Sequence, residues 1–415
     1  MSKSSFLINK KVERVDIAII CILLMVVGLL RSRLFLSLGM VGLGVTGLWG
    51  VSPKEWLRDK WWLLGLGWVA MYAISGFWSD NKEEWSVFLQ LKLPVVLLPV
   101  AFRFLPSFSA KQLQLLTLAM GLLLLGGAFY SVSFLVMDYD FYVKQYNVSH
   151  LIPTPVYNDY ICFSMSCALY IVWAMYRLPG LLSRSAQWGT AVIAALLAVY
   201  LHILASKSGL IALYIFAFSA ALYGIIARRN KAAMLSLLAI PLVLYLGVTY
   251  VPTLKERKEH IIYTWYRYMD HDRTGKLGDL SRLISYEISL KLIAEHPITG
   301  TGTGDMLAEM NKGYDKWYPA VTDERNRLIP HNQFLTIALG CGIPAMLLFL
   351  WWVVMPLFQM PKGRARLFFV ATWLALFVQL MIEPFLEGQF GVFIYLFFPL
   401  MIMHCMQNET KRMSL

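Results

Sequence analysis

Apolar stretches of 16 to 25 residues alternate with short polar segments along most of the chain. Crossing a hydrocarbon core of ~30 Å takes about 20 mostly apolar residues in a helix. The pattern therefore predicts an all-α, polytopic integral membrane protein with about twelve transmembrane helices. The predicted spans are residues 15–30, 34–51, 61–78, 86–103, 112–136, 156–176, 188–205, 208–227, 232–251, 332–356, 366–382 and 390–406.

The distribution of charge predicts the orientation of these spans. Only 15% of the 415 residues are charged, against about one quarter in soluble domains. With the N-terminus in the cytoplasm, the inside segments carry 19 Lys and Arg and the short outside loops carry 5. Cytoplasmic loops are enriched in Lys and Arg, so both termini are expected there. The net charge of +12 follows from this topology and does not indicate a nucleic-acid partner.

The longest connection between spans is the segment 252–330, which this topology places outside. The chain then divides into residues 1–251 with helices 1–9, the large loop 252–330, and residues 331–415 with helices 10–12. The polar loop 138–155 is predicted to lie on the same side. The first apolar stretch lacks a small-residue cleavage site and leads into another span, so we expect it to be retained.

The large loop contains an amphipathic pattern. Residues 280–296 place Ile284, Ile288 and Leu292 on one face, which predicts a helix with Asp279 as its N-cap. Pro297 would end that helix. The glycine-rich run 300–304 that follows lacks the Gly-Lys-Ser/Thr of a phosphate-binding loop, so a flexible turn is the better interpretation.

Three polar motifs have candidate chemistry. His331 opens a predicted span at its outer end, where it could act as a general base or simply cap or anchor the helix. Arg282, in the first turn of the loop helix, suits phosphate oxygens, but it could also pair with Asp279 or Glu287. Lys207, at the outer membrane face, is either functional or a snorkelling side chain.

Other features allow weaker interpretations. Lys92 lies inside a predicted span near Pro94 and Pro99, so it could line a cavity, but no partner can be assigned. Aromatic residues of the large loop could stack on sugars or prenyl chains, although interfacial anchoring is the commoner role. They include Trp265, Tyr266, Trp317 and Tyr318. The five cysteines lie in apolar segments, and no metal-ligand spacing is found, so neither a metal nor a cofactor is expected.

The order and sidedness of these motifs resemble the O-antigen ligase family, which also contains O-antigen and exopolysaccharide polymerases. The motifs are Ser206-Lys207-Ser208-Gly209, Arg282 upstream of the glycine-rich run, and His331-Asn332 at the start of a span. The resemblance implies a GT-C-like membrane fold in the bacterial inner membrane. It also implies metal-independent, inverting transfer of a glycan from undecaprenyl diphosphate at the periplasmic face.

The same resemblance implies roles for individual residues. Arg282 and His331 would be catalytic, and Lys207 and Arg282 would bind the donor diphosphate. Asn332, Ser206 and Ser208 would support them. The family has arginine where this chain has Lys207, and lysine keeps the charge but loses the bidentate fork.

The acceptor defines two related functions. It would be lipid A-core in a ligase and a second lipid-linked glycan in a polymerase, and a single dominant outer loop favours the ligase. A transporter is the alternative from another class, but transporters place ionisable residues near the midplane and often show repeated halves. Here Lys92 is the one Lys or Arg well inside a span, and no repeat is visible.

Overall fold

The computed structural model describes residues 13–49, 51–148, 150–155, 159–270, 278–360 and 363–413. These residues form α-helices and short 3-10 helices, with no strand among them. Twelve of the α-helices occupy the twelve predicted apolar positions. They are α1 (Arg14–Arg31), α2 (Arg33–Leu48), α4 (Lys60–Ser75), α5 (Lys82–Phe104), α6 (Ala110–Met137), α8 (Tyr160–Arg177), α9 (Arg184–Leu204), α10 (Lys207–Arg228), α11 (Lys231–Tyr250), α15 (Gln333–Gln359), α16 (Arg364–Ile382) and α17 (Gln389–Met413).

Among the described residues, nine helices are long and apolar enough to cross a membrane. The three others at predicted positions differ for identifiable reasons: α2 and α4 have 16 residues each, and α1 includes Arg14, Asp16 and Arg31. The all-helical, membrane-spanning character is therefore confirmed, while the number twelve stays a prediction.

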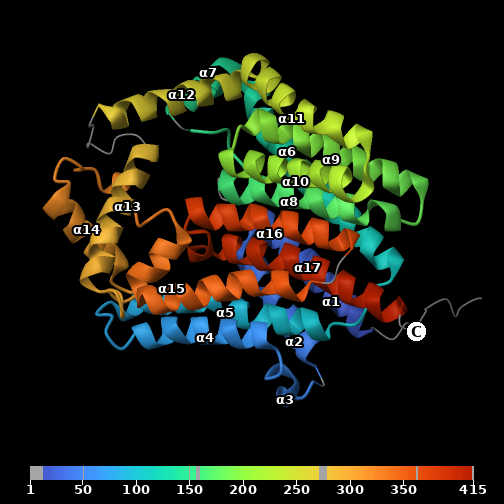
Figure 1. The fold of residues 1–415 in the computed structure, drawn as a ribbon, viewed down its shortest axis with the longest axis horizontal. Helices are drawn as coiled ribbons and strands as arrows, with labels where there is room; N and C mark the ends of the chain where they lie inside the picture. Colours follow the sequence, from blue (N-terminus) through green and yellow to red (C-terminus); the bar gives the residue numbers. More distant parts are fainter. Residues whose placement is uncertain are drawn as a thin grey trace, which may run out of the picture.

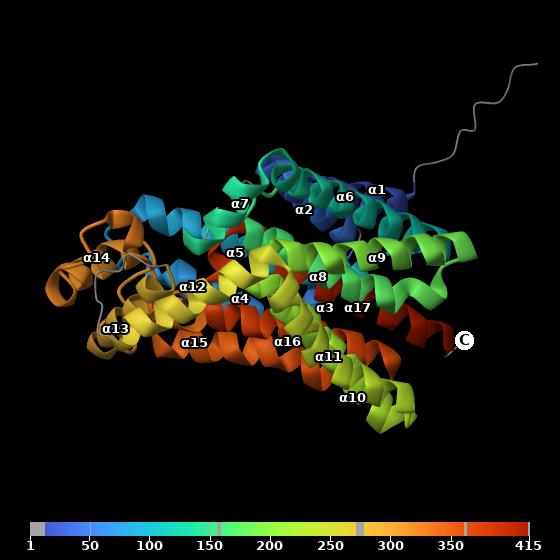
Figure 2. The ribbon, with the colours of Figure 1, turned by 90° about the horizontal axis from the view of Figure 1, so that it is seen from above.

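Helices of the large loop extend beyond one end of the bundle (Figure 1). The apolar helices run roughly side by side, and α12 (Pro252–Met269), α13 (Gly278–Glu295) and α14 (Met306–Trp317) lie at the left end in this view. The C-terminal end of the chain is marked at the opposite end in both ribbon views (Figure 2). Both the large loop and the short α7 (Tyr139–Gln145) thus lie away from the C-terminus, as the predicted topology requires.

Inside the bundle, α8 and α17 are the most enclosed spans and α11 the least. An aromatic cluster joins α4 to α15: Trp61 stacks on Trp352 at 5.7 Å, and Trp68 lies 4.6 Å from Phe349. Such ring pairs add specific geometry to the burial of large apolar surfaces. The cluster fixes α15, and the two residues directly before this helix, His331 and Asn332, form part of the site described below.

The predicted loop helix is confirmed. α13 buries Ile284, Ile288 and Leu292 against residues of α14 such as Met310 and Tyr314, so the loop has a small core of its own. The N-cap predicted at Asp279 concerns a side chain outside the described part of the chain.

The glycine-rich turn is bonded to a break in α15. The Thr301 and Gly302 amides donate to the Leu339 and Gly340 carbonyls at 2.7 and 3.1 Å. Gly342 has a φ of 86°, and a Cβ there would lie 2.0 Å from the Ile298 carbonyl oxygen, so only glycine allows this approach. The turn was expected to be flexible, but these contacts anchor the loop to the membrane bundle.

Two further contacts fix the loop. The Asp305 carboxylate accepts from the Asp80 and Asn81 amides at 2.7 and 3.0 Å, which joins the start of α14 to the connection between α4 and α5. On the other side, His260 Nδ1 of α12 donates to the Asn147 carbonyl at 3.0 Å, in the short helix η1 (Tyr146–Val148). The predicted outer loop 138–155 therefore supports α12.

Candidate functional site

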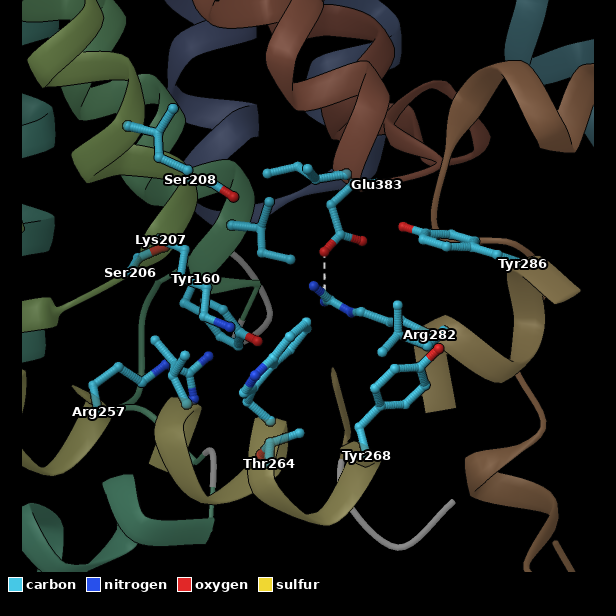
Figure 3. A pocket seen from close by; sticks show the side chains of 16 residues that line it. Tyr160, Ser206, Lys207, Ser208, Arg257, Thr264, Tyr268, Arg282, Tyr286 and Glu383 are labelled. Atoms are coloured by element: carbon cyan, nitrogen blue, oxygen red, sulfur yellow. Dashed lines mark ion pairs between the residues drawn. The ribbon is translucent and has the colours of Figure 1, made fainter. Parts of the chain in front are cut away.

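A cavity of about 370 Å³ lies where the large loop meets the ends of the apolar helices (Figure 3). Residues of α8, α10, α12 and α13 and the end of α16 form its wall. Its polar lining residues are Tyr160, Ser206, Lys207, Ser208, Arg257, Thr264, Tyr268, Arg282, Tyr286 and Glu383. The rest of the wall includes the apolar side chains Ile161, Ile211, Ile261, Trp265, Leu283 and Ile382.

Lys207 lines this cavity because of the way α10 begins. Ser206 caps the helix and is buried, with its Oγ 2.9 Å from Ser164 Oγ of α8. A Cβ on Gly209 would lie 2.6 Å from Ser164 Cβ, so glycine lets α10 approach α8 closely. Ala205 has a φ of 52° and makes the turn from α9. The Ser-Lys-Ser-Gly motif thus fixes the start of α10, with Lys207 in its first turn.

Arg282 lines the same cavity from α13, and its ion-pair partner is a residue that the sequence did not suggest. Its Nη2 lies 2.5 Å from Glu383 Oε1, which Figure 3 shows by a dashed line. Glu287, one of the two predicted partners, accepts instead from the Tyr318 hydroxyl. The other, Asp279, lies outside the described side chains.

His331 stands beside the cavity and contacts the other oxygen of the same carboxylate. Its Nδ1 lies 2.7 Å from Glu383 Oε2, and the Tyr286 hydroxyl donates to its carbonyl oxygen at 2.6 Å. Asn332 caps α15 by accepting from the amides of Phe334 and Leu335. Glu383 therefore bridges Arg282 and His331, two residues that the sequence proposed separately.

Sequence reasoning missed both Glu383 and Arg257. Glu383 directly follows α16, and Pro384 separates it from the 3-10 helix η4 (Phe385–Glu387). The signal for it was a carboxylate in a short connection between two apolar spans. Arg257 of α12 is only 8% exposed although three of its neighbours, Lys255, Glu256 and Lys258, are charged. No comparable signal separated it from the other basic residues of the loop.

Lys92 does not line this cavity. It is fully buried in α5, and its Nζ lies 2.6 Å from both Glu387 Oε2 and the Leu386 carbonyl. The other carboxylate oxygen of Glu387 accepts from Gln333 Nε2 at 2.6 Å and from the Tyr72 hydroxyl at 3.1 Å. Lys92 therefore has a partner within the protein core, on the same short connection that carries Glu383.

The composition of the cavity favours a large anion with an apolar part. Three cations and one carboxylate line it. Of the four aromatic loop residues named from the sequence, Trp265 lines the cavity and the other three do not. Within the described ranges, no three His, Cys, Asp or Glu side chains lie close enough together to hold a metal ion. The groups in its wall that suit an anion are the three cationic side chains.

Residues 190–350 match the family model for O-antigen ligase. The resemblance inferred from the motifs is thereby confirmed for this part of the chain. No curated protein matches the chain. Members of the family are membrane glycosyltransferase-like enzymes that use lipid-linked glycans.

The O-antigen ligase match includes all three motifs found in the sequence and ends before the two glutamates of the connection between α16 and α17. Lys207, Arg282 and His331 lie within it, whereas Glu383 and Glu387 follow its last residue. The carboxylates that organise the site thus come from a part of the chain beyond the family match. Their link to the site is seen in their ion pairs with Arg282, His331 and Lys92.

Proposed function

We propose that this protein is an O-antigen ligase-type glycosyltransferase. It would transfer a polysaccharide from undecaprenyl diphosphate to lipid A-core at the periplasmic face of the inner membrane, with both termini in the cytoplasm. The observation that carries the proposal is that Lys207, Arg257 and Arg282 line one cavity beside the His331–Glu383 pair.

The cations suit the donor diphosphate. Arg282 is partly neutralised by Glu383, and Lys207 and Arg257 bring two further positive charges to the wall of the cavity. Lys207 also lies at the N-terminus of α10, where the helix dipole adds a partial positive charge. Preorganised cations stabilise the charge that develops on a leaving diphosphate more than they stabilise the bound donor. This arrangement supports Lys207, Arg257 and Arg282 as diphosphate-binding residues.

The apolar wall suits the lipid part of the donor. Ile211, Ile261 and Ile382 line the cavity from three different helices, and Trp265 completes this surface. A prenyl chain would contact these residues while its diphosphate meets the cations. A binding site with apolar walls and a few convergent polar groups is the usual form of a ligand pocket.

His331 suits the acceptor hydroxyl. Glu383 binds Nδ1, so a neutral imidazole with its proton on Nδ1 presents an unprotonated Nε2. The acceptor oxygen would attack the anomeric carbon and form the new glycosidic bond. The bond from that carbon to the diphosphate would break, with its electron pair leaving on the diphosphate, and the hydroxyl proton would pass to Nε2. One in-line displacement inverts the anomeric centre without a metal.

The second candidate is a polymerase with the same donor and a second lipid-linked glycan as acceptor. One large outer segment, 252–330, favours the ligase. Deleting the gene in the native host distinguishes the two functions. Loss of a ligase leaves long glycan on undecaprenyl diphosphate, whereas loss of a polymerase leaves single repeats.

The direct test uses the purified full chain with an undecaprenyl diphosphate-linked glycan and lipid A-core. We expect glycan to appear on lipid A-core with inverted anomeric configuration, and EDTA to leave the rate unchanged. Movement of lipid or solute without any glycan transfer would reject the enzyme and favour a transporter.

A further inference from the structure

A second, lateral groove lies between α2, α5 and the start of α17. It has a volume of about 430 Å³ and is lined mostly by apolar side chains such as Val41 of α2 and Leu93 of α5. These two side chains are 56% and 54% exposed, so the groove opens sideways toward the surrounding bilayer. None of its lining residues belongs to the cavity around Lys207.

The outer end of the groove is polar. Gln389 lines the groove, and its Nε2 donates to Ser37 Oγ at 2.6 Å and to the Arg33 carbonyl at 3.2 Å. The Arg33 guanidinium lies 5.8 Å from the Phe390 ring centroid, directly beside Gln389. Ser37 is one helical turn from Arg33, so the arginine and the groove share one face of α2.

Arg31 and Arg33 are exceptions to the charge pattern of the chain. They stand in the predicted outside turn between α1 and α2, where basic residues are few, and both are exposed. Guanidinium groups suit phosphate oxygens. An apolar groove with an arginine at its mouth is complementary to a lipid that carries phosphate on its headgroup.

The groove and the cavity around Lys207 both end at the residues 383–389, which connect α16 to α17. Gln389 lines the groove, and Glu383 lines the cavity. Gln389 follows Glu387 by two residues and Glu383 by six, and Glu383 contacts His331. In Figure 1, α2 and α5 lie below α16 and α17, whereas α10 and α12 lie above them. A lipid held in the groove would therefore bring its headgroup to the residues 383–389 without sharing a cavity with the donor.

We infer that this groove binds an acyl chain of the acceptor, a phosphorylated glycolipid of the lipid A class, with its phosphate near Arg33. The inference rests on the proposed function, because it assigns the acceptor to one side of the residues 383–389 and the donor to the other. Transfer then takes place between two membrane lipids that approach the His331–Glu383 pair from different helix faces.

The test compares two tryptophan variants on α2. Val41→Trp fills the groove, whereas Leu38→Trp places the same side chain at a lipid-facing position, 52% exposed, that does not line it. Binding of radiolabelled bisphosphorylated lipid A to the full chain in nanodiscs is measured first, and glycan transfer second. We expect Val41→Trp and Arg33→Gln each to raise the Kd for lipid A and the acceptor KM about tenfold. Leu38→Trp should match the wild type, and the donor KM should stay constant in all variants.

The two readouts separate the inference from the proposed function. If the wild type binds lipid A but transfers no glycan, and Val41→Trp loses the binding, the groove is retained as a lipid A site and the ligase function is rejected. Normal transfer with equal lipid A binding in Val41→Trp and Leu38→Trp would retain the ligase and reject the groove. Equal loss of binding in both tryptophan variants would also reject it, because the effect would then be unrelated to the groove.

Discussion

Two ion pairs lie on one short connection and differ in their surroundings. Glu383 pairs with Arg282 at the edge of the cavity, where the arginine side chain is 25% exposed. Glu387 pairs with Lys92 in the core, where the lysine side chain is 0% exposed and the carboxylate also accepts from Gln333 and Tyr72. The same pairing chemistry therefore occurs once where a ligand has access and once where it has none.

The difference suggests a division of roles along the residues 383–387. A buried pair with satisfied hydrogen bonds holds its backbone in one position, since either charge alone would be strongly disfavoured. The Leu386 amide and carbonyl are both bonded within this network, to Gln333 and Lys92. We conclude that the Lys92–Glu387 pair fixes the connection, and that the connection in turn positions Glu383 between Arg282 and His331.

The largest effect is expected at the two residues that contact Glu383 beside the cavity. Arg282→Ala and His331→Ala should each slow glycan transfer by about a thousandfold, as the loss of one transition-state donor or a general base does. The measurement is the initial rate of transfer to lipid A-core by purified protein. Arg325→Ala is the matched control, because this arginine lies in the same loop with its side chain 89% exposed, and it should retain full activity. Near-normal rates in both variants would exclude this active site, provided that membrane insertion is unchanged.

At the buried pair the effect should appear in stability. Lys92→Met keeps the apolar stem but leaves Glu387 unpaired in the core, so we expect a loss of about 3–5 kcal/mol in unfolding free energy. Replacing both residues, as Lys92→Met with Glu387→Gln, should restore most of that loss, because no charge is then buried alone and the amide oxygen can still accept from Gln333 and Tyr72. Thermal unfolding in detergent micelles measures both. A double variant that is as unstable as the single one would contradict a role based on the pair.

A change at Glu383 should lower the rate of transfer, whereas a change at the Lys92–Glu387 pair should lower stability. Glu383→Gln keeps the shape but removes the charge that orients His331 and offsets Arg282, so the kcat for transfer should fall roughly a hundredfold. Removing a carboxylate from a cationic cavity should leave the donor KM unchanged or lower it. Steady-state kinetics with varied donor separates the two constants, with Glu309→Gln on the loop surface as the control. A raised donor KM at unchanged kcat would show that Glu383 acts on binding only.

The membrane helices and the three cavity motifs could be predicted from the sequence because their signals are local. Apolar length defines the spans, and the periodicity of Ile284, Ile288 and Leu292 defines α13. The partners could not be predicted, since the Lys92–Glu387 contact joins residues 295 positions apart and His331–Glu383 joins residues 52 apart. Arg257 was missed for a related reason: its burial depends on how α12 packs over η1, which no local pattern records.

The smallest effect is expected at Lys207, where the chain departs from the family that it resembles. Lys207→Arg restores the family residue and keeps one positive charge at the start of α10, so transfer should stay within about threefold of the wild type. The arginine fork needs more room than an ammonium, and the buried residues Ser206 and Ser208 flank the position closely. Initial rates measure the outcome, with Lys207→Ala beside it to show how much the charge itself contributes. An inactive Lys207→Arg variant with the same Tm as the wild type would mean that the cavity accepts only the smaller ammonium group. The lysine would then bind the diphosphate as a compact point charge rather than through a bidentate contact.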